Sequence, residues 1–232
     1  AKVRTGGKES KFGLPIARVD EFVRAATDLG SRVVGLHAHL GSGVETAQHW
    51  RLMCDELAGF ARRIGSVQTI DIGGGLPIPY SAEDEPFDLD AWAEGLAEVK
   101  ALHPAFRLAI EPGRYLVAES GVLLGQVRAT KNAGNNHFVL VDTGFNELMR
   151  PSMYGSYHAM SVLRRDGSAA AEQPTVVAGP LCESGDVFTQ GDGGVVLPRD
   201  LPAAQVGDLL VIHDTGAYGA SMSSNYNTRP LI

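Results

Sequence analysis

The chain has 232 residues, 44% of them hydrophobic, and a formal net charge of -7 at pH 7. That hydrophobic content suffices for one large or two modest packed cores, and the lack of a basic block argues against nucleic acid as a partner. Two cysteines are too few for a disulfide framework, and no apolar run is long enough to span a bilayer or resembles a leading signal segment. We therefore predict a globular, cytoplasmic protein that acts on a small, soluble molecule and contacts neither nucleic acid nor a membrane.

Residues up to about 116 alternate between short apolar runs and helix-like stretches. In two of these stretches apolar residues recur at steps of three and four, which is the period of an amphipathic helix. The members are Trp50, Met53, Leu57, Phe60 and Ile64 in the first and Trp92, Leu96 and Val99 in the second. Strands that alternate with helices need crossover connections, so this half predicts a parallel sheet, either open or closed into a barrel.

The number of strands in this half limits the alternatives. Three clear strands are too few for a closed barrel, which has about eight. The sheet is therefore either open or part of a barrel whose other strands lie outside this sequence. Residues 1–14 are predicted to be a loop that enters a helix at Pro15, and because no initiator Met precedes them, we expect the sequence to begin inside a longer chain.

After residue 116 the helical pattern ends and short strands take its place. Four β-branched runs are bounded by Gly, Asp, Asn or Pro, which is typical of an antiparallel β domain. They are VLLGQVRAT, HFVLVDTG, PTVVAGPL and DLLVIHDTG, and residues 164–174 are the one linker-like segment. The sequence thus predicts an α/β domain over residues 1–116 and an antiparallel β domain over residues 117–232.

Three polar motifs, HAHLGSG, DIGGG and EPGR, each follow an apolar run directly. Because the carboxyl ends of parallel strands meet at one edge of a sheet, where ligands bind in such folds, we expect the three motifs to share a pocket. Ser42, Gly73, Gly74 and Gly75 suit an anion, since glycines let backbone N–H groups approach phosphate oxygens and a hydroxyl adds a donor. The alternative is that the glycines only form tight turns.

His37 and His39 alternate on a predicted strand, so their side chains should point to opposite faces and only one should face the pocket. A zinc site would need further ligands at a suitable spacing, and because these are missing we predict no metal. A structural histidine, or an imidazole lying against a flat cofactor ring, remains. Glu111 and Arg114 either form an ion pair with each other or are aimed outward by Pro112, which ends the strand.

The segment GPLCESGDVF, residues 179–188, sets Cys182 beside Glu183 and has no second cysteine nearby. A free cysteine is most often a buried, inert packing residue. We assign Cys54, on the apolar face of a predicted helix, to that role. Cys182 is either a second packing residue or a reactive thiol, and Asp186 is expected to be structural.

Six motifs occur along the chain in a fixed order and extend over essentially all of it. They are HAHLGSG, DIGGG, EPGR, VDTGFNELMRPSMYGSYH, GPLCESGD and GAYGASMSSNYNTRP. In this order they resemble the alanine-racemase-like, fold type III decarboxylases that use pyridoxal phosphate, and most closely the members that act on diaminopimelate. The family fold, a (β/α)8 barrel of TIM type followed by a β domain, implies that residues 1–116 are the C-terminal part of a partial, cofactor-binding barrel and residues 117–232 its antiparallel β domain.

The resemblance implies a cofactor-binding role for all three strand-end motifs. His39 matches the imidazole that stacks on the cofactor ring, and Glu111 matches the carboxylate that pairs with the pyridine nitrogen. This pairing keeps the nitrogen protonated, so that the ring can take up the electron pair left when CO2 departs. The matched phosphate contacts are Ser42, Gly75, Gly113, Arg114 and Tyr218.

The resemblance also accounts for the isolated cysteine. Cys182 matches the family's proton donor, which returns a proton to Cα after decarboxylation. An unperturbed thiol has a pKa of about 8.5, so such a group can donate at neutral pH. Glu183 matches the residue that binds the substrate's distal ammonium. The residues matched to the remaining substrate contacts, chiefly to the distal carboxylate, are Arg114, Arg150, Tyr154 and Tyr218.

The implied catalytic residues are therefore Cys182, Glu111 and His39, and the implied reaction is the decarboxylation of meso-2,6-diaminopimelate to L-lysine and CO2 in lysine biosynthesis. In this family the CESGD segment reaches the cofactor of the other subunit, which implies a homodimer with active sites at the interface. One alternative is a related decarboxylase of ornithine, arginine, carboxynorspermidine or a carrier-bound amino acid. A second alternative is a non-catalytic protein that binds pyridoxal phosphate. CESGD and RPSMYGSYH favour diaminopimelate, because a second carboxylate needs a cation such as Arg150.

The sequence departs from the family at the anchor of the cofactor. The family binds it as a Schiff base to a lysine in a motif like Tyr-Ala-x-Lys-Ala-Asn on the first barrel strand, and no such motif occurs here. The lysines of the chain stand in other contexts: Lys2, Lys8, Lys11, Lys100 and Lys131. The sequence also stops at NTRPLI, short of the family's usual C-terminal end. We expect a partial chain that lacks the early barrel strands.

Overall fold

The computed structural model describes residues 10–44 and 46–231, and these form two compact units. The first unit extends to Ile78 and resumes over Glu85–Tyr115, and the second consists of Pro79–Asp84 and the residues from Leu116 onward. Lys2 and Lys8 lie outside the described residues, as does most of the predicted N-terminal loop. Within the described residues, no helix is long and apolar enough to cross a membrane.

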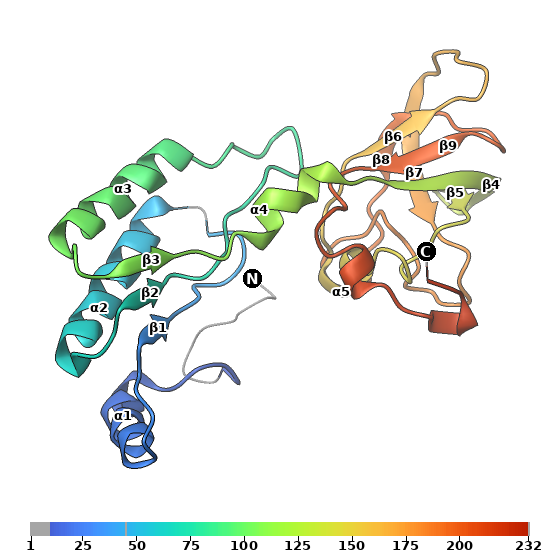
Figure 1. The fold of residues 1–232 in the computed structure, drawn as a ribbon. Coiled ribbons are helices and arrows are strands. Elements are labelled where there is room, and N and C mark those ends of the chain that lie inside the picture. The colour runs from blue at the N-terminus through green and yellow to red at the C-terminus, as the bar shows by residue number, and fades with distance from the viewer. Residues whose placement is uncertain (1–9, 45, 232) are drawn as a thin grey trace. The chain divides into compact units, whose positions relative to one another are not determined.

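The first unit is a three-stranded parallel sheet with helical crossovers (Figure 1). This confirms the predicted alternation of strands and helices, and a helical segment does begin directly after Pro15. The elements in chain order are η1 (Ile16–Arg18), α1 (Val19–Asp28), β1 (Gly35–His37), α2 (Ala47–Ile64), β2 (Thr69–Asp71), α3 (Leu89–Leu102) and β3 (Arg107–Ala109), and α4 (Gly113–Val117) spans the boundary to the second unit.

The core of the first unit lies between the sheet and helices α2 and α3. Trp50 is fully buried on α2 and packs edge-on against Phe87 and Trp92, with ring centroids 5.5 and 6.3 Å apart. Ile70 of β2 and Val99 of α3 belong to the same apolar cluster. The spacing of apolar residues in the sequence therefore identified the buried helix faces correctly.

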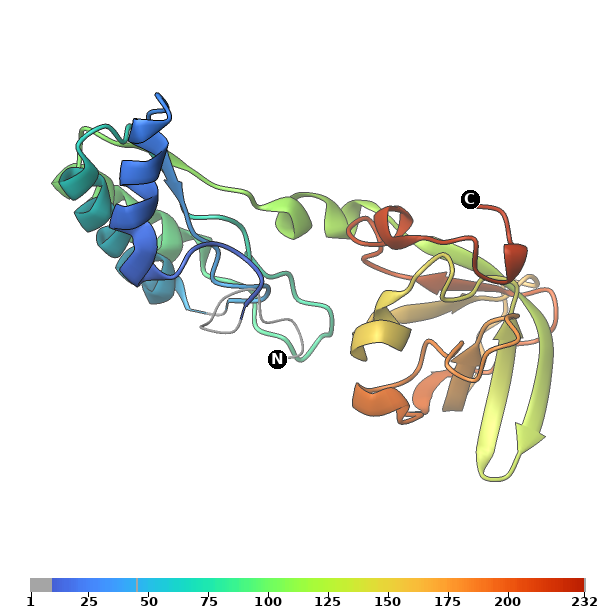
Figure 2. The same cartoon turned by 90° about the horizontal axis from the view of Figure 1, so that it is seen from below.

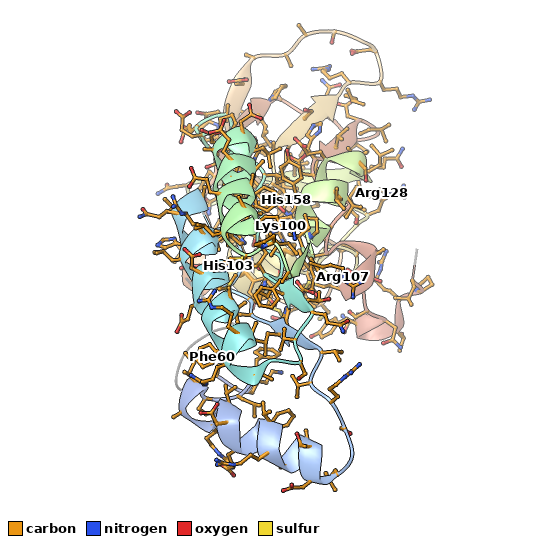
Figure 3. All side chains as sticks on the ribbon, turned by 60° about the vertical axis from the view of Figure 1, so that its left-hand side comes forward. Phe60, Lys100, His103, Arg107, Arg128 and His158 are labelled. Atoms are coloured by element: carbon orange, nitrogen blue, oxygen red, sulfur yellow. The ribbon has the colours of Figure 1, made fainter. Side chains whose placement is uncertain are left out.

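The ends of these helices follow local sequence signals. Asp88 caps the start of α3 by accepting a hydrogen bond from the Ala91 N–H at 2.9 Å. Lys100, in the last turn of α3 (Figure 3), donates to the carbonyl oxygens of Pro104 at 2.8 Å and Phe106 at 2.6 Å. Its ammonium group therefore binds main-chain carbonyls beyond the helix end.

The second unit is a six-stranded sheet in the order β6-β9-β4-β5-β7-β8. Strands β4 and β5 form a long hairpin (Figure 2), and the core contains Val127, Val139, Leu210 and Ile212. The elements are η2 (Ala118–Ser120), β4 (Leu123–Ala133), β5 (Asn136–Val141), α5 (Arg150–Tyr154), β6 (Met160–Leu163), β7 (Glu172–Ala178), η3 (Asp192–Gly194), β8 (Arg199–Pro202), β9 (Leu209–Ile212), η4 (Ala220–Met222) and η5 (Tyr226–Thr228).

The prediction of a purely antiparallel second domain is wrong in one respect, because β5 and β7 pair in parallel. Parallel neighbours need a long connection, and here α5 and β6 lie between the two strands in the sequence. The helical pattern also does not end at residue 116, since α5 is a short helix that begins beside Pro151 and ends before Gly155. A helix of five residues is too short to show a periodic pattern.

Two strands of the second unit were not predicted. Strand β6 is short, and β8 contains Pro202, a residue type that is uncommon within strands because it lacks an N–H. Strand β7 begins at Glu172, inside the segment predicted to be a linker. Pairing with neighbouring strands, and not local propensity, defines these elements.

Candidate active site

The ends of β1, β2 and β3 bring three side chains together at one edge of the parallel sheet. The register pairs His37 with Asp71, and Glu111 follows β3 two residues after its end. His37 Nε2 lies 3.3 Å from Glu111 Oε2, and one possible ligand atom from each of the three residues lies within 4.8 Å of the others. The prediction of no metal was made because no further ligands stand at a suitable spacing from His37 in the sequence. The structure brings Asp71 close to His37 from a neighbouring strand. Chemically the trio could hold a divalent cation as well as a cationic ring nitrogen.

The glycines of GSG and GGG form two loops that pack against each other. Gly43 N–H and Val44 N–H donate to the Gly75 carbonyl oxygen at 3.2 and 3.1 Å. Gly75 has φ 103°, and a Cβ on it would overlap the Gly41 carbonyl oxygen. Gly75 is therefore required by both backbone conformation and close approach. Ser42 lies in the first loop and is half-buried.

His39 is oriented by the second of these loops. Its Nδ1 accepts a hydrogen bond from the Gly74 N–H at 3.1 Å, so the neutral ring carries its proton on Nε2. His37 contacts Glu111 of the EPGR motif, and His39 contacts Gly74 of the GGG motif. Strand β1 ends at His37, and so the alternation of side chains does not continue to His39.

The EPGR motif turns from β3 into α4. Glu111 N–H donates to the Gly73 carbonyl at 2.9 Å, which ties this motif to the glycine loop. A Cβ on Gly113 would meet no atom within 4 Å, so open space lies beside it. Arg114 follows in the first turn of α4 and is half-buried. The first unit thus gathers one set of predicted residues: His39, Ser42, Gly75, Glu111, Gly113 and Arg114.

The second set of predicted residues lies in the second unit, where Arg150 is central. Arg150 is only 5% exposed, at the start of α5. Its guanidinium carbon lies 4.8 Å from the ring centroid of Tyr80 and 5.9 Å from that of Tyr218. Tyr154, at the other end of α5, is half-buried. Tyr80 was missed in the sequence because it lies about 70 residues from Arg150, in a segment without a recognisable motif.

Tyr218 has a backbone conformation that large residues rarely adopt. Its φ is 61°, in the left-handed region that favours glycine, and its side chain is 38% exposed. Such strain persists only where the surrounding structure enforces it, and it is common at functional sites. The neighbouring loop is fixed by hydrogen bonds from the N–H groups of Thr215 and Gly216 to the carbonyls of Gly121 and Ala118, both at 2.9 Å.

The CESGD loop is attached to α5. Ser152 Oγ donates to the Gly185 carbonyl at 2.7 Å. Asp186 is buried, and its carboxylate accepts from the N–H groups of Phe145 at 2.7 Å and Leu181 at 2.8 Å. Burial raises the pKa of Asp186, although these N–H groups act in the opposite direction. Asp186 therefore has the structural role expected for it.

Cys182 and Glu183 stand exposed on this loop. Glu183 accepts from the Gly185 N–H and Ser184 Oγ, both at 3.2 Å, and from Tyr226 Oη at 3.1 Å. These donors, the Gly185 N–H first, lower the pKa of Glu183. Sequence reasoning missed Tyr226, although it lies in the quoted GAYGASMSSNYNTRP motif.

The two cysteines differ in exposure. Cys54 is fully buried in the core of the first unit, and burial raises its pKa to about 11. Cys182 is exposed. The alternative in which Cys182 is a buried packing residue is therefore wrong for this structure, whereas Cys54 fits that role.

The described lysines do not resemble a cofactor anchor. Lys100 binds main-chain carbonyls, Lys11 Nζ lies 5.0 Å from the Phe12 ring centroid, and Lys131 Nζ lies 5.6 Å from that of Phe138. All three lysines are exposed, and none lies within a strand-end motif.

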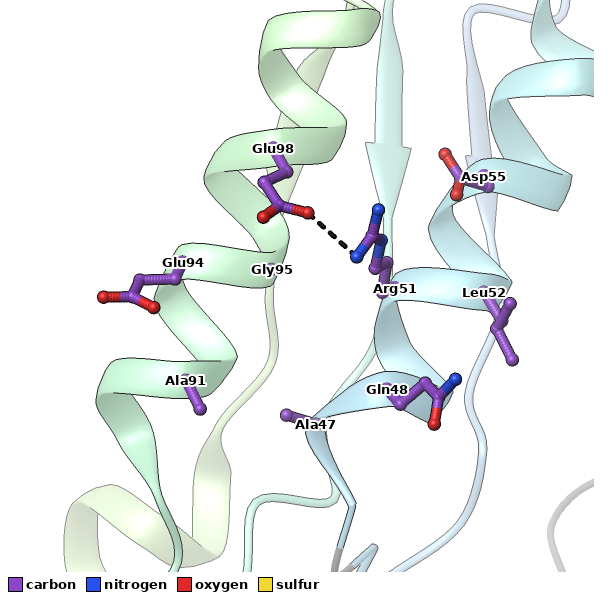
Figure 4. A pocket seen from close by; sticks show the side chains of 9 residues that line it. All are labelled: Ala47, Gln48, Arg51, Leu52, Asp55, Ala91, Glu94, Gly95 and Glu98. Atoms are coloured by element: carbon purple, nitrogen blue, oxygen red, sulfur yellow. Dashed lines mark ion pairs between the residues drawn. The ribbon is translucent and has the colours of Figure 1, made fainter.

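A groove of about 460 Å³ lies between α2 and α3 (Figure 4). An ion pair between Arg51 and Glu98, 2.8 Å long, crosses it. The lining residues are Ala47, Gln48, Arg51, Leu52, Asp55, Ala91, Glu94, Gly95 and Glu98. None of the predicted site residues is among them, so the groove is separate from the strand-end motifs.

Comparison with known families identifies the class of protein to which this chain belongs. The family model described as pyridoxal-dependent decarboxylase, C-terminal sheet domain, matches residues 27–216. This range includes the three strand-end motifs, α5 and the CESGD loop. The chain belongs to this family of pyridoxal-dependent decarboxylases.

Two of the relatives that this chain matches are diaminopimelate decarboxylases. The diaminopimelate decarboxylase of Streptomyces coelicolor is 51% identical over 239 residues, and that of Buchnera aphidicola subsp. Acyrthosiphon pisum is 49% identical over 240 residues. Both alignments cover 100% of this chain, but 54% and 57% of the respective relatives. The chain thus spans about half the length of the curated relatives it matches.

Solved structures show the same similarity. A crystal structure of diaminopimelate decarboxylase aligns with a TM-score of 0.90 at 48% identity, covering 99% of this chain and 56% of that one. The Helicobacter pylori diaminopimelate decarboxylase complexed with L-lysine aligns with a TM-score of 0.86 at 33% identity, covering 100% of this chain and 56% of that one.

Proposed function

We propose that this chain is part of a diaminopimelate decarboxylase, which uses pyridoxal phosphate to convert meso-2,6-diaminopimelate to L-lysine and CO2. Residues 1–116 would form the C-terminal part of a (β/α)8 barrel, and residues 117–232 the β domain. The observation that carries the substrate assignment is Arg150, a nearly buried cation between aromatic rings on a motif shared with this family. The alignments to relatives of that name support the same assignment.

The residues at the strand ends fit pyridoxal phosphate. Ser42 and Arg114 supply donors for a phosphate, and open space beside Gly113 leaves room for it. His39 offers a ring whose tautomer is fixed by Gly74, and Glu111 offers a carboxylate for the pyridine nitrogen. When bound, the cofactor supplies an electron sink for the pair released as CO2 departs. Glu111 would hold the proton on the pyridine nitrogen, which maintains that sink.

The residues of the second unit would bind and protonate the substrate. Diaminopimelate has a carboxylate at each end, and the one that is not released needs a partner. Arg150 and Tyr154, with Arg114 and Tyr218, would bind it, since a guanidinium offers a planar fork of donors to a carboxylate. Glu183, kept ionised by its hydrogen bonds, would bind the distal ammonium. Cys182 would then return a proton to Cα.

The exposed position of Cys182 and Glu183 supports a homodimer. Groups proposed to act on substrate are expected to be enclosed when they work, because exclusion of water strengthens their interactions. Both are exposed in the single chain. A second copy that completes the site would enclose them, and we propose that the enzyme acts as a homodimer in the cytoplasm.

Release of CO2 from alternative substrates tests this proposal. In the holoenzyme carrying this chain, Arg150→Ala should lower kcat/KM for meso-diaminopimelate by about 10-fold to 100-fold, as expected for the loss of a hydrogen-bonded charge pair. It should hardly change slow activity on lysine or ornithine, which have no carboxylate at the end away from the reacting carbon. Equal losses on all three substrates, or a native preference for ornithine, would move the chain to a related decarboxylase.

A further inference from the structure

A histidine outside the predicted set contacts Arg150. His158 is fully buried in the second unit and follows α5 by four residues (Figure 3). Its Nε2 lies 2.8 Å from Arg150 Nη1, and its Nδ1 lies 2.8 Å from the His213 carbonyl oxygen. The imidazole therefore bridges the main chain after β9 and the guanidinium on α5.

The two partners fix the protonation of the ring. A carbonyl oxygen can only accept, so Nδ1 must carry a proton, and a guanidinium can only donate, so Nε2 must not. His158 is thus held as the neutral Nδ1–H tautomer. A second proton would remove the acceptor and set two cations 2.8 Å apart.

Further contacts hold the imidazole and its backbone. The ring lies 5.2 Å from that of Tyr80 at an interplanar angle of 73°, and Tyr80 also contacts Arg150. Arg199 Nη1 donates to the His158 carbonyl oxygen. Because both the ring and the main chain are fixed, the position of Nε2 is defined to the accuracy that a directed hydrogen bond needs.

We infer that His158 is a positioning residue, which orients the Arg150 guanidinium toward the substrate's distal carboxylate without neutralising it. A carboxylate at this place would also orient Arg150, but it would compete with the substrate for the same charge. A neutral imidazole nitrogen accepts one N–H and does not itself neutralise the positive charge. The inference rests on the proposed function, since it assumes that Arg150 binds a carboxylate.

Two amide variants separate the two hydrogen bonds of the ring. In His158→Gln the side-chain oxygen is as many bonds from Cα as Nε2, so it can still accept from Arg150. In His158→Asn the amide nitrogen can replace Nδ1 as donor to the His213 carbonyl, but no acceptor reaches Arg150. Both variants lack the ring. If His158 only fills space, the two variants should have similar KM values and should differ, if at all, in melting temperature.

Kinetics of the holoenzyme carrying this chain would give the first readout. His158→Asn should raise KM for meso-diaminopimelate on the order of 10-fold to 100-fold with kcat changed much less, which corresponds to one hydrogen bond to a charged group. His158→Gln should keep KM within about threefold of the native value.

Competitive inhibition by L-lysine and by 1,5-diaminopentane gives a readout independent of turnover. Only lysine has a carboxylate, so its advantage over the diamine should shrink in the Asn variant and persist in the Gln variant.

The outcomes distinguish this inference from the proposed function. If both amide variants match the native KM while Arg150→Ala loses selectivity, His158 does not position Arg150 but the substrate assignment holds. If Arg150→Ala also leaves selectivity unchanged, the assignment of Arg150 itself fails. A ¹⁵N spectrum of labelled protein that shows a proton on Nε2 of His158 would overturn the inference directly, and a pyridine-like Nε2 would support it.

Discussion

The two units of the molecule position their proposed functional groups by different means. At the ends of β1, β2 and β3, the main chain does most of this: parallel register brings the motifs together, and glycines allow close approach. In the second unit, buried polar side chains such as Asp186 and His158 hold loops and a cation in place. The difference teaches that the first site should be sensitive to added atoms, and the second to the loss of single hydrogen-bonding groups.

The largest expected difference between the two units comes from their cysteines, one of which lies in each unit. Cys182→Ala should lower kcat by roughly 100- to 10000-fold, as expected for a lost general acid, with little change in cofactor binding or melting temperature. Cys54→Ala should do the reverse, with a loss of about 1 kcal/mol in the free energy of unfolding and a native turnover per active site. Steady-state kinetics and thermal melts of both variants make the comparison. An early-melting Cys182→Ala protein with native turnover would contradict the acid role.

A second test adds one methyl group to the first site. Gly75→Ala should weaken binding of pyridoxal phosphate by roughly 100-fold, because strain of this kind costs on the order of 1 to 3 kcal/mol and the new Cβ meets the Gly41 carbonyl. Gly95→Ala is the matched control, since its Cβ would meet open space on α3. Absorbance titration of the apoenzyme measures both. Native affinity in Gly75→Ala would show that the glycine loop does not shape the cofactor site.

A third test removes one acceptor from the second unit. In Asp186→Asn the amide nitrogen would face either the Phe145 or the Leu181 N–H, so the free energy of unfolding should fall by about 1 to 3 kcal/mol. The exposed Asp28→Asn is the control, with a small expected change. Urea unfolding measures both, and a neutral Asp186→Asn would mean that its carboxylate does not hold the loop.

The same variant has a pH signature. Because burial raises the pKa of Asp186 in the folded protein, the unfolded chain loses this proton first as pH rises. The folded state then binds more protons than the unfolded state, so this group's contribution to stability falls with rising pH between the unfolded and the folded pKa. Asp186→Asn should lack that part of the slope when unfolding is measured from pH 3 upward.

The smallest expected effect comes from Tyr226. Tyr226→Phe keeps the ring contact with Phe145, at 4.8 Å between centroids, but removes the hydroxyl that donates to Glu183. The pKa of Glu183 should move up toward its ordinary value, and KM for meso-diaminopimelate should rise about two- to threefold, because the carboxylate remains ionised at pH 7 but is less firmly held. A ¹³C titration of Glu183 with steady-state kinetics checks this. An unchanged titration would show that the hydroxyl does not act on Glu183.

The sequence by itself determined those features that depend on short-range pattern. Apolar residues at helical spacing predicted α2 and α3 and their buried faces, and polar motifs after apolar runs predicted that GGG and EPGR meet at one sheet edge. The order of six motifs indicated the family. The resemblance of the CESGD motif to that family set Cys182 apart from Cys54, which is buried. These signals are local, so a linear reading can detect them.

Only the tertiary structure decided the contacts between residues far apart in the chain. The strand register placed the Asp71 side chain beside His37 and Glu111, a contact that residue spacing in the sequence did not predict. The long connection through α5 and β6 made β5 and β7 parallel neighbours. His158 and Tyr226 lie in quoted motifs and Tyr80 in none, but no spacing in the sequence indicates their partners. The contacts Arg150–His158 and Tyr80–His158 join residues 8 and 78 positions apart in the chain. Packing in three dimensions gives such residues their roles, because a hydrogen bond or ring contact depends on position in space and not on spacing in sequence.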